Sequence, residues 1–259
     1  MSAENRQSKI VEMVMEKGEI KIKDICESFD VSDMTARRDL NELDKHGLLR
    51  RVHGGAVANL GRSYEPSFRT RSTKNSKAKQ AIGKKAAEMI FDGDSIALDV
   101  GTTTLEIAKN LGGIRNLTVI TNSVQISNEL VRALTLETEA RLILTGGIVR
   151  PRELSMVGTI PEYVYQKYHV DKVFLGIGGI SVENGLTEFN MEDAQIKQVL
   201  LNSARTKIVV ADSSKFGVTT FSSVGALSSI DKIITDMNAS NEIVDKIRKE
   251  DVEVIQVEI

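Results

Sequence analysis

The sequence has almost no cysteine and no long apolar run. Cys26 is the only cysteine in 259 residues, which excludes an intramolecular disulfide and favours a reducing compartment. No apolar stretch approaches the roughly 20 residues that a membrane-spanning helix needs, and the first eight residues contain no apolar core of a secretion signal. We therefore expect a cytoplasmic protein that makes no membrane contact.

A strong net charge is absent as well. The chain carries 34 Lys and Arg residues against 36 Asp and Glu residues, a formal net charge of −2. Overall charge therefore gives no argument for a nucleic-acid partner, and only local clustering of basic residues does. The hydrophobic share of 41% and the charged share of 27% are those of a globular protein and exclude a disordered or fibrous chain.

The usual signatures of metal and nucleotide sites are missing. His46, His53 and His169 do not have the spacing of metal ligands, and a single cysteine makes a zinc site improbable. There is no Walker A sequence, and no Gly-x-Gly-x-x-Gly follows the first strand predicted for the C-terminal part of the chain. We therefore expect no metal and no cofactor.

The N-terminal part of the chain has the pattern of a small DNA-binding domain. Apolar periodicity and turn residues predict a helix, a short strand, two helices and a glycine-permitted hairpin, at residues 5–17, 19–23, 24–29, 33–46 and 48–57. The second helix is expected to bury Ile25, Cys26 and Phe29. This order is that of a winged helix-turn-helix over residues 1–57, a length that folds alone only marginally.

The third predicted helix has the features of a DNA recognition helix. Ser32 is the expected N-cap, and Asp33 suits the positive end of the helix dipole. Ala36, Leu40 and Leu43 form an apolar face at helical spacing. The opposite face suits a groove, since arginine can hold guanine and asparagine can hold adenine by paired hydrogen bonds. From this helix we expect DNA contacts by Ser32, Met34, Thr35, Arg37, Arg38, Asn41 and Lys45.

A basic segment follows the hairpin. Six basic residues stand against one acid, Glu65, between residues 58 and 79. We interpret residues 58–75 as a linker that runs into a basic helix. Two roles stay open for it: a solvated tether, or a segment that touches DNA phosphates.

From residue 76 onward, strand and helix patterns alternate. The strand candidates are short runs rich in Val, Ile and Leu, as expected for parallel strands buried on both faces. The alternation predicts a doubly wound, mostly parallel α/β sheet domain over residues 76–259, with right-handed crossovers. Strands are expected at 95–100, 117–121, 141–145, 172–177, 207–211, 232–235 and 253–257, and helices at 78–90, 104–111, 124–134, 192–204 and 241–250.

Small polar residues follow five of the predicted strands. Ligands of open α/β sheets bind outside the carboxyl ends of the strands, and this edge offers many hydrogen-bond donors but no aromatic platform. It suits a small polyol or phosphate group. The turn at Gly101 opens a helix and is a potential anion site, while Lys215 can supply positive charge and Asp99 can accept from sugar hydroxyls. The candidate effector-binding residues are Asp99, Gly101, Thr102, Thr103, Thr121, Asn122, Gly146, Gly147, Gly178, Asp212 and Lys215.

A group of acids near the start of one predicted helix is the best catalytic candidate. Glu188, Glu192 and Asp193 are of the residue types that serve in acid–base chemistry. Acids in a first helical turn are more often partners of the helix dipole. We therefore expect no catalytic residue.

Both halves of the chain resemble one family. The N-terminal motif runs from Val31-Ser-x-x-Thr-x-Arg-Arg-Asp-Leu to His53-Gly-Gly-Ala56, and the C-terminal motifs are Asp99-x-Gly-Thr-Thr, Thr121-Asn122, Thr145-Gly-Gly147, Gly185-Leu-Thr and Ala211-Asp-Ser-Ser-Lys215. These motifs closely resemble those of the DeoR/GlpR family of bacterial sugar-catabolism regulators. The resemblance covers nearly the whole chain.

The resemblance implies a repressor that loses its operator when its C-terminal sensor binds a phosphorylated sugar. It also implies that the helix beginning at Ser32 reads the major groove and that the hairpin Arg50–Gly55 acts as the wing, which adds Arg50, Arg51 and His53 to the expected DNA contacts. A single small module makes too few contacts for tight specific binding. We therefore expect a homodimer or homotetramer on double-stranded operator DNA.

A second hypothesis follows from the same resemblance. The sensor domains of this family are similar to ribose-5-phosphate isomerase and to CoA-transferase-like enzymes, so a sugar-phosphate isomerase with an appended DNA-binding domain is the alternative. An isomerase is expected to need carboxylates and a lysine beside the sugar carbons. The segment Gly176–Ile180 carries no acid, which favours a regulator that is not an enzyme.

Overall fold

The chain folds into two compact units, residues 1–70 and 71–259. The computed structural model describes residues 2–58, 61–134 and 139–259. The division falls within helix α4 (Phe68–Thr73), so the segment expected to be a linker contains a short helix. The Tyr64 hydroxyl donates to the carbonyl of Met15, which ties another part of that segment to the N-terminal unit.

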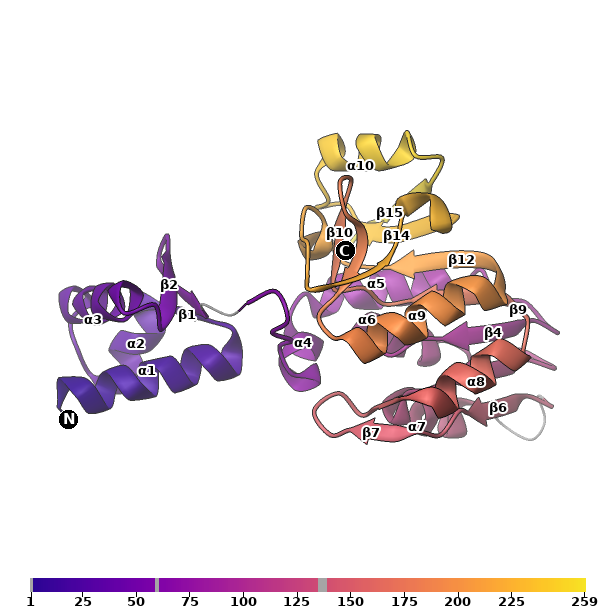
Figure 1. Ribbon diagram of the computed structural model, residues 1–259, viewed down its shortest axis with the longest axis horizontal. Helices are drawn as coiled ribbons and strands as arrows, with labels where there is room; N and C mark the ends of the chain where they lie inside the picture. The colour runs from indigo at the N-terminus through magenta and orange to yellow at the C-terminus, as the bar shows by residue number, and fades with distance from the viewer. Residues whose placement is uncertain (1, 59–60, 135–138) are drawn as a thin grey trace. The chain divides into compact units, whose positions relative to one another are not determined.

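The N-terminal unit is a winged helix-turn-helix, as predicted (Figure 1). Its three strands form an antiparallel sheet in the order β1-β3-β2. The elements are α1 (Ala3–Lys17), β1 (Glu19–Lys21), α2 (Ile22–Phe29), α3 (Asp33–Lys45), β2 (Leu49–Val52) and β3 (Gly55–Ala58).

A small apolar core holds the three helices and the sheet together. Ile10, Ile25 and Leu40 are completely buried, and Leu49 is 1% exposed. The expected burial of Cys26 and Phe29 is wrong in degree, because both are only partly buried and pack at the edge of this core.

One glycine decides whether the small sheet can form. A Cβ on Gly55 would lie 2.1 Å from the carbonyl oxygen of Ile20. That distance is far below van der Waals contact, so β3 can pair with β1 in this register only when a glycine stands there.

The C-terminal unit is built on a seven-stranded parallel sheet, which confirms the predicted doubly wound fold. The strand order is β15-β14-β12-β9-β4-β5-β6. The order reverses between β4 and β9, and this switch point is where doubly wound folds bind their ligands. The strands are β4 (Ser95–Leu98), β5 (Thr118–Thr121), β6 (Arg141–Leu144), β9 (Val170–Leu175), β12 (Ala204–Val210), β14 (Lys232–Asp236) and β15 (Glu253–Val257).

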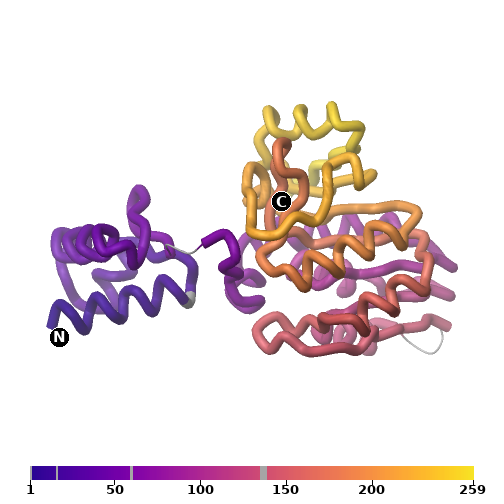
Figure 2. The backbone as a smooth tube through the Cα atoms, in the orientation of Figure 1, coloured from indigo at the N-terminus to yellow at the C-terminus, as the bar shows by residue number. Residues whose placement is uncertain are grey.

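Helices cover both faces of this sheet (Figure 1, Figure 2). Successive strand residues point to opposite faces, so Phe174 packs with the cluster of α5, α6 and α7, while Val173 and Leu175 pack with that of α8, α9 and α10. The helices are α5 (Ser76–Ala87), α6 (Thr102–Ala108), α7 (Val124–Ala133), α8 (Thr159–Lys167), α9 (Met191–Ser203) and α10 (Asn241–Arg248).

Several short elements were not expected from the sequence. They are helix α4, helix α8, the hairpin β7 (Ile148–Arg150) with β8 (Ser155–Val157), and a small sheet of β10 (Gly179–Ser181), β11 (Gly185–Glu188) and β13 (Ser222–Gly225). Each of these strands has only three or four residues. Except for α4, which precedes β4, these elements lie in segments that follow strands of the large sheet.

Candidate nucleic-acid interface and effector site

Helix α3 presents one apolar and one polar face, as the sequence predicted. Ser32 is the N-cap, since its hydroxyl accepts the backbone N–H of Thr35 at 3.3 Å. Ala36, Leu40 and Leu43 are buried in the core of the N-terminal unit. On the outer face Met34 is 81% exposed. The other outward residues of this helix and of the wing that were predicted to contact DNA are exposed too: Arg37, Arg38, Asn41, Lys45, Arg50 and His53.

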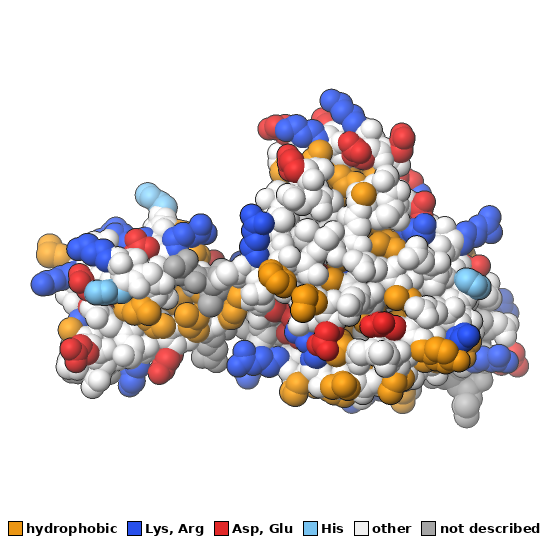
Figure 3. Space-filling view, in the orientation of Figure 1, with side chains coloured by type: hydrophobic (Ala, Val, Ile, Leu, Met, Phe, Trp, Pro, Cys, Tyr) orange, Lys and Arg blue, Asp and Glu red, His pale blue; other side chains and the backbone are white. Residues whose placement is uncertain are grey.

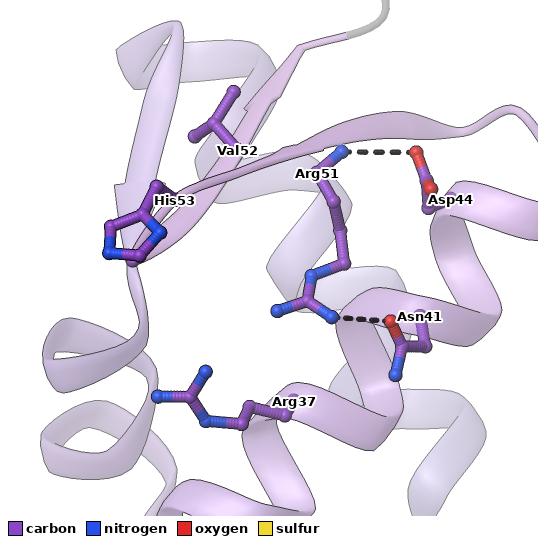
Figure 4. A pocket seen from close by; sticks show the side chains of 7 residues that line it. Arg37, Asn41, Asp44, Arg51, Val52 and His53 are labelled. Carbon is purple, nitrogen blue, oxygen red and sulfur yellow. Dashed lines mark hydrogen bonds between the residues drawn. The ribbon is translucent and has the colours of Figure 1, made fainter.

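A concave surface of about 570 Å³ lies between α3 and the wing (Figure 4). Arg51 connects its two sides: its backbone N–H donates to Asp44 at 3.0 Å, and its guanidinium donates to the Asn41 side chain at 2.5 Å. The structure thus brings four predicted DNA-contacting residues to one surface. The lining residues are Arg37, Asn41, Asp44, Arg51, Val52, His53 and Gly54.

Four polar residues of this surface have partners within the protein: Arg37, Asn41, Asp44 and Arg51. Arg37 forms an ion pair with Asp33, one helical turn before it, and the hydrogen bond from Arg37 lowers the pKa of Asp33. Because both groups are exposed, such a pair is weak, and Arg37 can exchange Asp33 for a phosphate or a base edge at little cost. Asp44 was not singled out from the sequence, and its role is to position the wing strand that carries Arg51.

Basic side chains gather on this part of the N-terminal unit. Figure 3 shows Lys, Arg and His side chains on this unit, with Asp and Glu side chains among them. The exposed cations of α3 and the wing, Arg37, Arg38, Lys45 and Arg50, are of the kind that phosphate backbones attract.

The sheet edge at the switch point is held by a buried charge network. Lys197 of α9 forms an ion pair with Asp99, which follows β4, and lies 3.4 Å from Glu188 of β11. Asp99 also accepts the backbone N–H of Gly176, which follows β9, at 3.1 Å. Burial would lower the pKa of Lys197, but the charges of Asp99, Glu188 and Asp193 raise it overall.

In this network the side chain of Asp99 is 1% exposed and engaged by Lys197 and Gly176. Its expected role as an acceptor from sugar hydroxyls stays a prediction. Lys197 was missed in the sequence because it looked like one more polar residue in an amphipathic helix. The sequence indicates Glu188 only as an acid near the start of a helix and gives no sign of its pairing with Lys197.

Two other predicted effector residues, Asn122 and Thr121, are buried and form hydrogen bonds within the protein. The Asn122 amide donates to the carbonyl of Met156 at 3.0 Å and accepts from the Tyr165 hydroxyl at 3.1 Å. Thr121 accepts the backbone N–H of Ser123 at 3.1 Å. These bonds attach the end of β5 to the hairpin β7–β8 and to α8. Both residues are completely buried.

The glycines of the edge are required for close packing. A Cβ on Gly147, where φ is +128°, would lie 2.8 Å from the carbonyl oxygen of Val157, and one on Gly178 would lie 2.8 Å from a carboxylate oxygen of Glu188. Gly101 caps α6, a helix of seven residues that begins two residues earlier than predicted, so Thr102 and Thr103 lie within it and are largely buried. Gly146, which precedes Gly147 in the chain, is half-buried.

The edge after β12 collects positive charge. Asp212 accepts from the Ser214 hydroxyl at 2.5 Å and from the Asn75 amide at 2.8 Å, with the Lys79 ammonium 3.9 Å away. Lys215 lies over the ring of Phe189, 5.6 Å from its centre. Burial lowers the pKa of Lys215, and the charge of Arg71 lowers it further.

The two halves of the chain match two named domains. Residues 6–60 match the DeoR-like helix-turn-helix domain, and residues 74–237 match the DeoR C terminal sensor domain. The chain belongs to the DeoR family of transcriptional regulators. The DeoR resemblance expected from the sequence motifs is thereby confirmed.

Relatives of this DeoR-family protein match along nearly their whole length. The glycerol-3-phosphate regulon repressor of Escherichia coli is 32% identical over 91% of this chain and 92% of its own. The transcriptional repressor AccR of Agrobacterium fabrum is 37% identical over 91% of this chain and 90% of its own. Among solved structures, ribose 5-phosphate isomerase A from Methanocaldococcus jannaschii gives a TM-score of 0.40 with 18% identity over 55% of each chain. A similarity this low carries no inference about activity.

The described part of this DeoR-family chain has neither a cluster of metal-binding residues nor a helix that could span a membrane. Within residues 2–58, 61–134 and 139–259, no three His, Cys, Asp or Glu residues are grouped as metal ligands. Over the same described residues, no helix has the length and apolar character needed to cross a bilayer.

Proposed function

We propose that this protein represses a sugar-catabolism operon and releases its operator when a phosphorylated sugar binds the C-terminal unit. The observation that carries the proposal is the pairing of an exposed recognition face on α3 with a polar, basic sheet edge in a DeoR sensor domain. The relatives named above are repressors, one of them of a glycerol-3-phosphate regulon, which supports a phosphorylated effector of small size.

The DNA-binding half of the proposal rests on α3 and the wing. Arg38 and Asn41 are exposed on the outer face and are suited to base edges, while Lys45, Arg50 and Arg51 are suited to phosphates. One winged helix makes too few contacts for tight specific binding, so two copies of the chain are expected on two half-sites. Sedimentation of the protein with and without duplex will show whether two or four subunits bind.

The effector half rests on the edge after β4, β9 and β12. Lys215 and the backbone around Gly101 and Gly178 lie at the ends of these strands, where a doubly wound sheet binds its ligand. The buried bonds of Asp99, Thr121 and Asn122 set the shape of this edge. These residues are therefore proposed to position the site.

The alternative is a sugar-phosphate isomerase, and the buried charge network argues against it. Proton abstraction requires a base that the substrate can reach. Lys197, Asp99 and Glu188 are 9% exposed or less in their side chains and are paired with one another. The proposal is therefore a regulator without enzymatic turnover.

One experiment tests both halves. Bound sequences selected from random duplexes supply the operator, and a thermal-shift panel of sugar phosphates, with the matching unphosphorylated sugars as controls, supplies the effector. A phosphorylated sugar that stabilises the protein and weakens operator binding at least tenfold is the expected result. If every stabilising sugar phosphate leaves operator binding unchanged, the regulatory proposal is wrong, and steady turnover of one of them identifies an enzyme instead.

A further inference from the structure

A cluster of basic side chains surrounds the start of helix α5, where the C-terminal unit begins. The side chain of Lys79 is only 6% exposed. Its ammonium donates to the backbone carbonyls of Arg71 and Lys74, the latter at 2.6 Å. Its nearest carboxylate oxygen, on Asp212, is 3.9 Å away, which is beyond hydrogen-bond length. The ammonium therefore fixes the chain around residues 71–74 and still has room for another acceptor.

Two further cations complete the cluster. Arg71 is 19% exposed in its side chain and forms an ion pair with Glu153, in the turn between β7 and β8. Lys215 lies over Phe189 at the end of β12. The positive charges of Arg71 and Lys74 act on both Lys79 and Lys215. The four residues Arg71, Lys74, Lys79 and Lys215 thus form one basic cluster.

Two acids contact this cluster of four cations: Asp212 lies beside Lys79, and Glu153 pairs with Arg71. Glu188, whose charge also acts on Lys215, is paired with Lys197. Burial and the repulsion between the cations lower the pKa of Lys79 to about 8, in spite of the attraction of Asp212. A cluster of four cations, of which Lys79 is buried, attracts an anion.

The start of α5 adds backbone donors to the same place. Asn75 stands at the N-cap, but its amide donates to Asp212, and no side chain caps this twelve-residue helix. Asn75 also lines a cavity of about 350 Å³ together with the hydroxyl-bearing residues Thr73, Ser76 and Ser213 and with Lys77 and Asp236. Arg71, Lys79 and Lys215 do not line this cavity. Helix N–H groups, hydroxyls and cations are the donors that phosphates prefer.

We propose that Arg71, Lys79 and Lys215 bind the phosphate group of the effector. This inference rests on the proposed function. It adds Arg71 and Lys79 of the α4–α5 segment to Lys215, which was already expected at the end of β12. On binding, the Arg71 guanidinium exchanges the Glu153 carboxylate for phosphate oxygens. The phosphate then contacts the stretch of chain that continues directly from the DNA-binding unit.

The test measures inorganic phosphate binding to the full-length protein by calorimetry, with sulfate-free chloride buffers of equal ionic strength. Arg71→Ala and Lys79→Met are each expected to weaken phosphate binding at least tenfold, and Arg71→Lys less, because it keeps charge but loses the paired donors. The matched controls Arg69→Ala and Lys84→Met remove exposed cations from the same two helices and are expected to change it less than twofold. Operator binding without phosphate reports that each variant is folded.

A variant that binds phosphate more tightly than the wild type distinguishes a phosphate subsite from a loss of folding, because an unfolded protein does not gain affinity. Glu153→Gln removes the competing carboxylate with little change of shape, so phosphate binding is expected to tighten severalfold. Unchanged or weaker binding in Glu153→Gln, or wild-type binding in Arg71→Ala and Lys79→Met, overturns the subsite. In that case a sugar phosphate that still releases the operator from these variants leaves the proposed function standing, whereas a wild-type protein that responds to no sugar phosphate contradicts both.

Discussion

At the residue scale, the most consequential side chain of the sheet edge is the buried Lys197. It stands between two carboxylates, on Asp99 and Glu188, that are themselves largely shielded from water. A buried ion pair of this kind contributes little compared with an apolar replacement, but removing one partner leaves an unpaired buried charge. The network is therefore sensitive to single changes.

Replacement of Lys197 by Met is expected to lower the free energy of unfolding by about 3–5 kcal/mol. Circular dichroism during urea unfolding measures this loss. Adding Asp99→Asn and Glu188→Gln to the same variant is expected to restore part of the stability, because the unpaired charges are then gone. If the single variant is as stable as the wild type, the lysine is not charged in the folded protein.

Lys79 gives a pH-dependent prediction. Burial lowers its pKa to about 8 in the folded protein from 10.5 in the unfolded chain. Between these values the unfolded chain holds a proton that the folded chain does not, so the free energy of unfolding rises with pH. This gain is lost again as the pH falls toward 8. The slope is at most about 1.4 kcal/mol per pH unit.

The measurement compares the wild type with Lys79→Met by urea unfolding across this pH range. The wild type is expected to gain stability relative to the variant as the pH rises. A difference that stays constant with pH shows that Lys79 titrates as an ordinary lysine.

At the element scale, the strands of the parallel sheet were predictable and the short additions to them were not. Runs such as residues 208–210 of β12 are apolar because both faces of the sheet are buried, and that leaves a signal within one segment of sequence. Lys197 and Asp99 lie 98 positions apart, so their pairing leaves no local signal. The hairpin β7–β8 is local in sequence, but its strands have three residues each, and Ile148 and Val149 are exposed, so it has no buried apolar run. The DNA-contacting and effector-binding residues named from the sequence stay predictions.

The wing depends on the close approach of β3 to β1. Gly55→Ala is expected to destabilise the N-terminal unit by roughly 1–3 kcal/mol, the usual range for an overpacked site, since the added Cβ meets the carbonyl of Ile20. Thermal unfolding measures the loss, and operator affinity is expected to fall with it. Gly61→Ala is the control, because a Cβ there would have no neighbour within 4 Å.

The recognition helix gives a prediction about sequence preference. Arg38→Ala is expected to cost about 1–3 kcal/mol of operator binding and to relax the preference at one base position, if Arg38 holds a base edge. Binding to the operator and to single-base variants of it, at one salt concentration, measures both effects. An equal loss on every sequence identifies Arg38 as a phosphate contact instead.

At the scale of the whole molecule, regulation is an exchange of free energy between two sites. A sugar phosphate that binds the DNA-bound and free forms equally well releases nothing, however tightly it binds. A tenfold release of the operator requires a coupling free energy of about 1.4 kcal/mol. The α4–α5 segment is where we expect this coupling to begin, because Arg71 and Lys79 hold the start of the C-terminal unit.

Coupling of this kind is reciprocal, which gives the last prediction. If a sugar phosphate weakens operator binding by a given factor, saturating operator duplex must weaken binding of that sugar phosphate by the same factor. Calorimetric titration of the sugar phosphate into the protein, alone and with operator or with a scrambled duplex, measures it. An operator effect equal to that of the scrambled duplex means that the two ligands compete through charge alone, because specific coupling must follow the operator sequence.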